Sequence, residues 1–118
     1  MPQYKTIQMR EDGDTLVVSV VGYLNSLLGE EVEKVVRARL DDGGRRILLN
    51  FQGTRLVNSI GISFVIGIVE KVMEREGKMA FCEVSRINCD LFRVTGLAKY
   101  VRSFDTEKEA LEYLSGTA

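Results

Sequence analysis

Ser59 is the residue whose type and position most clearly allow chemistry. It lies in residues 56–64, which join a predicted strand to a predicted helix. A serine at the start of a helix lies at the positive end of the helix dipole, among backbone N–H groups that have no acceptor within the helix. Those N–H groups would stabilise a phosphate on its hydroxyl. The simpler interpretation is that Ser59 is an N-cap, worth about 1 kcal/mol.

The helix predicted over residues 59–76 has two different halves when its residues are placed 100° apart. One half is apolar and must face a sheet: Gly61, Ile62, Val65, Ile66, Ile68, Val69, Val72 and Met73. The other half is charged only toward its end, and its first two turns hold Ser59, Ile60, Ser63, Phe64 and Gly67. We expect Phe64 to be at least partly exposed. Such a patch is typical of a docking surface, and cover by another part of the same domain is the alternative.

The elements that must position Ser59 alternate between strands and amphipathic helices. Strands are predicted over residues 4–10, 15–21, 45–51, 78–83 and 100–104, and helices over 27–40, 59–76, 85–95 and 107–114. This order predicts an α/β fold with a mixed, mostly parallel sheet of about five strands and about four helices. The length suits one domain, residues 1–118.

Composition argues against an enzyme. Histidine is absent, and Cys82 and Cys89 are not spaced as a redox or metal-binding pair. We therefore expect no catalytic residue, metal or cofactor, and two reduced, packed cysteines in a cytoplasmic protein. The 16 basic and 17 acidic residues give no electrostatic signature for nucleic acid or an anionic membrane. The longest apolar stretch is too short to span a bilayer.

Several short motifs, taken in order, resemble the STAS domain family. They are Gly22-Tyr23-Leu24-Asn25, Ile47-Leu48-Leu49-Asn50, Asn58-Ser59-Ile60-Gly61-Ile62-Ser63, Thr95-Gly96-Leu97 and Glu109-Ala110-Leu111. The resemblance covers nearly the whole chain and implies a STAS-like fold. In the antagonist branch of the family, the first serine of the third motif accepts phosphate from an anti-sigma factor that is also a serine kinase. Ser59 occupies that position, so the resemblance implies a non-enzymatic, phosphorylation-controlled switch in transcription regulation.

The resemblance also implies a partner-binding surface around Ser59. Its expected members are Tyr23, Leu24, Asn25, Asn58, Ser59, Ile60, Gly61, Ser63, Phe64 and Gly67. The expected partner is an anti-sigma factor with serine kinase activity or a related STAS-binding protein, and a phosphatase is a further candidate. We expect no nucleic-acid or membrane partner, and a monomer or weak dimer.

The chain departs from the family pattern at three aspartates, which are Asn25, Asn50 and Asn58 here. The second loop serine is Ile60, and the second loop glycine is Ser63. Asparagine keeps the shape of aspartate and some of its hydrogen bonds but carries no charge. A STAS protein that binds constitutively, or acts as a scaffold without phosphorylation, is therefore the alternative function. Nucleotide binding also occurs in the family, but nothing in this sequence specifies it.

Overall fold

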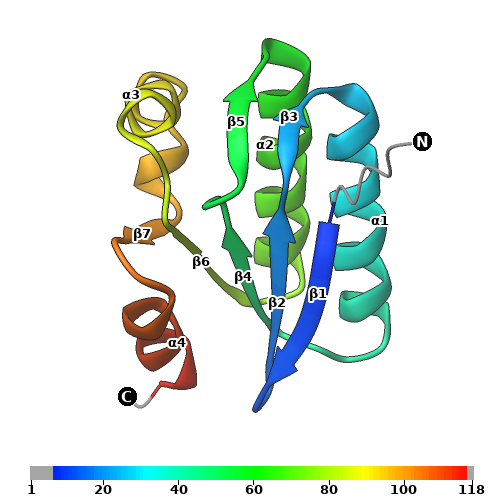
Figure 1. Cartoon of the computed structure of the whole chain (residues 1–118). Helices are drawn as coiled ribbons and strands as arrows, with labels where there is room; N and C mark the ends of the chain where they lie inside the picture. Colours follow the sequence, from blue (N-terminus) through cyan, green and yellow to red (C-terminus); the bar gives the residue numbers. More distant parts are fainter. Residues whose placement is uncertain (1–6, 117–118) are drawn as a thin grey trace, which may run out of the picture.

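A five-stranded sheet forms the centre of the molecule, as a computed structural model shows for residues 7–116. The strands lie in the order β1 (Ile7–Asp12), β2 (Thr15–Val20), β4 (Arg46–Asn50), β6 (Lys78–Cys82) and β7 (Arg102–Phe104) (Figure 1). β1 is antiparallel to β2, and the other neighbours are parallel. The predicted mixed, mostly parallel sheet is confirmed.

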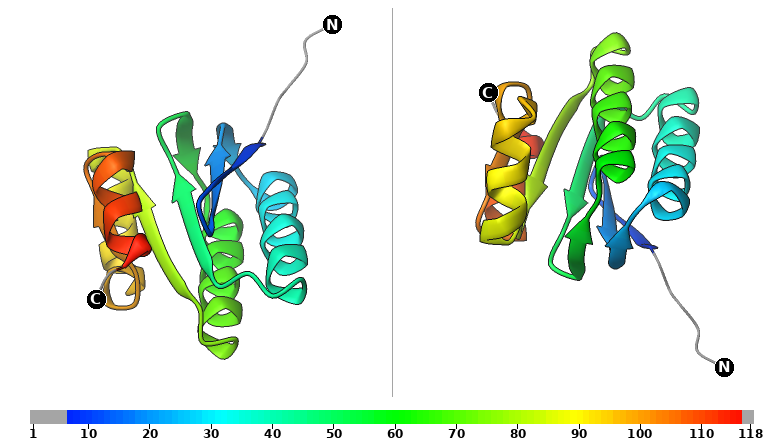
Figure 2. Two further views of the ribbon diagram at one scale, coloured as in Figure 1. Left: turned by 90° about the horizontal axis from the view of Figure 1, so that it is seen from below. Right: turned by 90° about the horizontal axis from the view of Figure 1, so that it is seen from above.

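Helices cover both faces of this sheet. They are α1 (Ser26–Asp41), α2 (Ser59–Glu74), α3 (Arg86–Val94) and α4 (Glu107–Ser115). α1 and α2 lie side by side in both views of Figure 2. No helix within residues 7–116 is both long and apolar enough to cross a membrane.

The central strands divide the core between the two faces by alternation. Val18 of β2 belongs to the large cluster that includes the buried residues of α1, α2 and α3. Its neighbour Val17 lies in a smaller cluster with Ala110 and Leu114 of α4. Helices cover both faces of the sheet, and β2 and β4 accordingly have nearly continuous apolar sequences, as we expected for buried strands.

Two short strands were not predicted. β3 (Gly22–Leu24) and β5 (Thr54–Val57) form a separate parallel pair, next to which the Gly22 N–H donates to the Gly53 carbonyl oxygen at 2.9 Å. Strands this short carry no readable period, so sequence patterning treated them as turns. A short 3₁₀ helix, η1 (Leu97–Lys99), was also missed.

Several element boundaries differ from the prediction. The first strand is described over Ile7–Asp12, so it extends past its expected end at Arg10, while the expected start at Tyr4 lies outside the described residues. The strand expected over residues 100–104 is confined to Arg102–Phe104.

The inward half of α2 is confirmed for most of its residues, but Met73 was placed wrongly. Its side chain is 51% exposed, and Ile66 is half-buried. Met73 lies in the last turn of α2, where it lines a hollow facing η1. Helical periodicity shows which side of a helix faces the core, but it does not show how far along the helix other elements cover that side.

The two cysteines are free thiols. Cys82 is buried in the α4 cluster, and burial raises the pKa of its thiol to about 12. Cys89 is half-buried.

A buried amide links the sheet to α4. Asn50, at the end of β4, accepts a hydrogen bond from the Gln52 N–H at 2.8 Å and donates its own N–H to Glu107 at 2.9 Å. The other Glu107 oxygen accepts from Arg10 of β1 at 2.6 Å. The hydrogen bond from Arg10 holds the pKa of Glu107 below its ordinary value, although burial acts in the opposite direction. A carboxylate at position 50 would face Glu107, which accounts for asparagine here.

The contacts of Asn50 therefore predict that a substitution at this position has a pH-dependent effect on the free energy of unfolding. Asn50→Asp replaces the amide donor with a like charge, and we expect the free energy of unfolding to fall by about 2 kcal/mol at neutral pH. At pH values above the ordinary pKa of a carboxyl group, ionised Glu107 stabilises the wild-type fold. This stabilisation is lost as pH falls through the lowered pKa of Glu107. In the variant, acid relieves the repulsion, so the difference from wild type should narrow as pH falls.

Urea denaturation between pH 4 and pH 8 measures this difference. The double variant Asn50→Asp/Glu107→Gln removes one of the two charges and should regain part of the loss at neutral pH, because it also gives up the charged partner of Arg10. A loss that is independent of pH and persists in the double variant would contradict the arrangement.

Candidate functional site

Two strand–helix junctions lie next to each other at one end of the molecule. β3 leads through Asn25 into α1, and β5 leads through Asn58 into α2 (Figure 1). Leu24 and Val57, the last residues of the two strands, are register partners. The Asn58 N–H donates to the Leu24 carbonyl oxygen at 3.1 Å. The N-termini of α1 and α2 therefore emerge side by side.

Both helix N-termini are capped by asparagine. The Asn25 Oδ1 accepts from the Leu28 N–H at 3.1 Å, and the Asn58 Oδ1 accepts from the Gly61 N–H at 2.7 Å. An amide oxygen performs this role as an aspartate oxygen would. These asparagines thus keep the local structure without its charge. Asn50, the third departure from the family pattern, contacts Glu107 instead.

Ser59 is not the N-cap. It is the first residue of α2, it is exposed, and its carbonyl oxygen accepts from the Ser63 hydroxyl at 3.1 Å. Because Asn58 supplies the capping oxygen, the Ser59 hydroxyl has no hydrogen-bond partner among the described residues. The N–H groups of Ser59 and Ile60 have no acceptor within the helix, as in any first helical turn. Ser59 therefore presents a free hydroxyl beside unsatisfied N–H donors.

Gly61 allows α2 to approach β3 this closely. A Cβ at position 61 would lie 2.2 Å from the Leu24 carbonyl oxygen and 2.8 Å from its carbon. The obstacle is backbone, and the same carbonyl accepts from Asn58. Glycine at position 61 therefore sets the position of Ser59 relative to the end of β3.

The structure brings the predicted site residues to this one end, except Gly67 in the middle of α2, but gives them different roles. The exposed members are Tyr23, Ser59, Ile60 and Ser63. Asn25, Asn58, Phe64 and Gly67 are half-buried. Leu24 and Gly61 are buried, so they can position the surface but cannot present a side chain on it.

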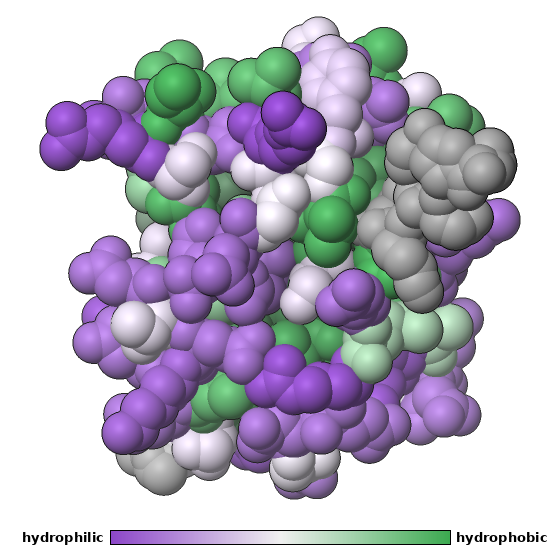
Figure 3. Space-filling view, viewed as in Figure 1, coloured by the Kyte–Doolittle hydropathy of each residue, from purple (hydrophilic) through white to green (hydrophobic). Residues whose placement is uncertain are grey.

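Two exposed leucines were missed by the sequence analysis. Leu27, in the first turn of α1, is 73% exposed, and Leu56, the register partner of Tyr23, is 57% exposed. Leu27 is the first residue of the helix predicted over residues 27–40, and Leu56 begins the segment predicted to join a strand to a helix, so neither was predicted to lie on this surface. We define the Ser59 face as Tyr23, Leu27, Leu56, Ser59, Ile60 and Ser63. Figure 3 shows hydrophobic side chains at this end of the molecule.

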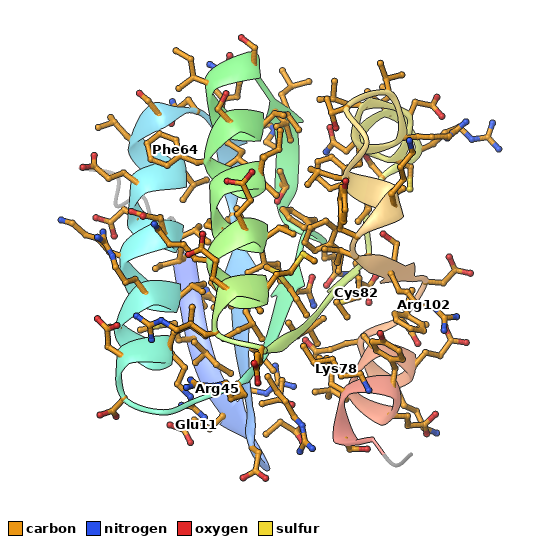
Figure 4. The ribbon with its side chains drawn as sticks, turned by 180° about the vertical axis from the view of Figure 1, so that it is seen from behind. Glu11, Arg45, Phe64, Lys78, Cys82 and Arg102 are labelled. Carbon is orange, nitrogen blue, oxygen red and sulfur yellow. The ribbon has the colours of Figure 1, made fainter. Side chains whose placement is uncertain are left out.

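The Phe64 side chain packs between α2 and α1 and is only partly on the surface. It is half-buried, so the expected partial exposure is confirmed. A Cβ on Gly29 of α1 would lie 2.8 Å from the Phe64 side chain, and Figure 4 shows Phe64 reaching from α2 toward α1. Part of the expected patch is thus covered by α1, the alternative that the sequence left open.

Comparison with known proteins identifies the family. The STAS domain model matches residues 6–110, so the chain belongs to the STAS domain family. The anti-sigma F factor antagonist of Paenibacillus polymyxa is 26% identical over 113 residues, which cover 92% of this chain and 93% of that protein.

Solved structures share the fold. An anti-sigma factor antagonist from Mycobacterium paratuberculosis has a TM-score of 0.82 at 19% identity, covering 94% of each chain. SpoIIAA from Bacillus has a TM-score of 0.77 in its unphosphorylated form, at 19% identity, covering 94% of this chain and 99% of that one. Its phosphorylated form has a TM-score of 0.74 at 21% identity, covering 91% and 97%.

The capping geometry predicts a difference between neighbouring alanine variants. Asn58→Ala removes the oxygen that satisfies the Gly61 N–H and should lower the free energy of unfolding by about 1 kcal/mol. Ser59→Ala removes a hydroxyl with no partner and should change it by less than about 0.5 kcal/mol. Urea denaturation of both variants tests the assignment, and the reverse order would show that Ser59 is the cap.

The close approach at Leu24 predicts opposite effects for two glycines of α2. Gly61→Ala forces a methyl group against backbone and should cost about 1–3 kcal/mol. A Cβ at Gly67 would meet nothing within 4 Å. Gly67→Ala should therefore stabilise the helix by up to about 1 kcal/mol. Equal effects of the two substitutions, measured as thermal midpoints, would contradict this packing.

Proposed function

We propose that this chain is a non-enzymatic regulatory binding module, switched by phosphorylation of Ser59, whose partner is an anti-sigma factor with serine kinase activity. The observation that carries the proposal is the exposed Ser59 hydroxyl, free because Asn58 caps the helix. Support comes from the Paenibacillus relative, named an anti-sigma F factor antagonist, and from SpoIIAA, solved in both phosphorylation states.

The modification fits the local electrostatics. A kinase would transfer the γ-phosphoryl group of ATP to the Ser59 oxygen, displacing the hydroxyl proton and releasing ADP. The product carries about −1.5 to −2 charge, which the N–H groups of Ser59 and Ile60 and the dipole of α2 can stabilise. The fold can therefore accept the phosphate.

The surrounding surface explains why phosphate would control binding. No residue of the Ser59 face carries a charged side chain, and its largest members, Tyr23, Leu27, Leu56 and Ile60, are about half-exposed or more. A partner that covers this face would exclude water from it. A dianion in such an interface must lose its hydration, and none of the residues of the Ser59 face supplies a matching cation. Phosphorylation should therefore release the partner.

Constitutive binding is the second candidate function, and the asparagine caps favour it. Asn25 and Asn58 keep the helix ends in place without the negative charges of the family pattern. A kinase that recognises those charges would not recognise this loop. The apolar Ser59 face would then bind a partner, or a scaffold, without modification.

Incubation with candidate anti-sigma factor kinases and ATP, followed by phosphopeptide mass spectrometry, tests the modification directly. Phosphate should be found on Ser59, and Ser59→Ala should abolish it. Calorimetry should then show partner affinity weaker by roughly 30-fold or more for the phosphorylated form, since an unpaired interfacial charge costs about 2–5 kcal/mol. Equal affinity of the two forms would favour the constitutive alternative.

A matched pair of variants tests the surface separately from the switch. Ile60→Ala removes an apolar side chain that is 52% exposed beside Ser59, and Met9→Ala removes one that is 55% exposed on β1. Only the first should weaken partner binding, by about tenfold. Equal effects of the two would place the interface elsewhere.

A further inference from the structure

An apolar hollow lies toward the other end of α2 from Ser59. It has a volume of about 570 Å³. One side is formed by the last turns of α2, and the other by the end of α3 and η1, elements that can be followed in Figure 4. Nothing in the proposed switch uses this hollow.

The hollow is lined mainly by apolar side chains, several of which are exposed to solvent. Val69 and Leu97 form the buried part of its lining, while Ile66 is half-buried. Met73 and Tyr100 are 51% and 64% exposed. Ile66 and Met73 belong to the half of α2 whose pattern predicts burial, so the hollow is where that helix lacks its expected cover. Methionine and tyrosine are common at surfaces that bind polypeptides.

The polar side chains of the hollow give it a negative charge. Glu70 and Glu74 line it one helical turn apart, and neither forms an ion pair among residues 7–116. The basic residues beside them point elsewhere. Lys71 lies 3.9 Å from Glu33, and Arg75 lies 2.5 Å from Asp41, both in α1. None of the lining residues is basic.

This arrangement is unfavourable for α2 alone. Carboxylates four residues apart repel each other. Glu74 also lies in the last turn of α2, where the dipole disfavours negative charge. Placing the cations on the α1 side and the anions on the hollow side therefore has an electrostatic cost, and no ion pair of Glu70 or Glu74 within residues 7–116 offsets it.

We infer that the hollow is a docking groove for a basic amphipathic helix of a protein partner. The apolar face of such a helix would cover Ile66, Met73 and Tyr100. Lysine or arginine residues one turn apart would pair with Glu70 and Glu74, which have the same spacing along α2. A helix suits the site because Ile66, Glu70 and Met73 line the hollow at helical spacing along α2. The residues of a second helix recur at the same spacing, so they can meet this row in series.

Amide chemical shifts test the inference with a defined probe. The probe is a blocked peptide with two copies of the heptad LKKLLKL, titrated into ¹⁵N-labelled full-length protein. We expect shift changes centred on Ile66, Met73 and Tyr100. The same peptide with glutamate in place of every lysine should produce none there. An absence of shifts with the lysine peptide, or shifts centred on another surface, would overturn the inference.

Charge variants distinguish binding at this groove from non-specific electrostatic attraction of the peptide to the protein. Glu70→Gln/Glu74→Gln should weaken binding of the lysine peptide by about three- to tenfold. The double substitution should leave the thermal midpoint of the protein unchanged or raise it. Glu30→Gln/Glu31→Gln changes the net charge equally at exposed sites on α1 and should leave affinity unchanged. Equal weakening by both pairs would mean non-specific attraction. Ser59→Asp should have no effect, so this result does not depend on the switch.

Discussion

The carbonyl group of Leu24 is the point on which the geometry around Ser59 depends. Its oxygen accepts from the Asn58 N–H at 3.1 Å and faces the bare Cα of Gly61. These two contacts hold the start of α2 against the end of β3. Asn25 follows Leu24 directly and caps α1, so the same short stretch of backbone sets both helix N-termini. The exposed position of Ser59 follows from this contact.

The asparagines that depart from the family pattern have separate physical roles. Asn25 and Asn58 are neutral caps, whereas Asn50 donates to a carboxylate at the opposite face of the sheet. The consequence for the Ser59 face is electrostatic. With no charge among its residues, a phosphate on Ser59 would change the character of the face more than it would on a surface already rich in carboxylates.

Much of this structure could be predicted from the sequence because its signals were strong. Val17 and Val18 lie in a continuous β-branched run, which indicated a strand buried on both faces. Periodicity placed Ser59 and Ile60 on the outward side of α2, where they are found. The predictions failed where tertiary contacts decide. Patterning could not show that Asn58 and not Ser59 is the cap, because both residue types cap helices.

Other failures have the same origin. β3 and β5 are too short to show a period, and their pairing joins segments far apart in the chain. Met73 is exposed beside a hollow that Leu97 of η1 also lines, and periodicity along α2 carries no information about η1. The roles of Leu27 and Leu56 likewise became visible only once the two strand–helix junctions lay together.

The most direct test of this account is the free energy of unfolding of the protein phosphorylated at Ser59. If Asn58 holds the cap and the Ser59 hydroxyl is free, the modified protein should be at least as stable as the unmodified one in urea at neutral pH. The helix dipole could add up to about 1 kcal/mol. A loss of more than about 1 kcal/mol would contradict the account, because it would mean that the fold itself depends on the unmodified serine.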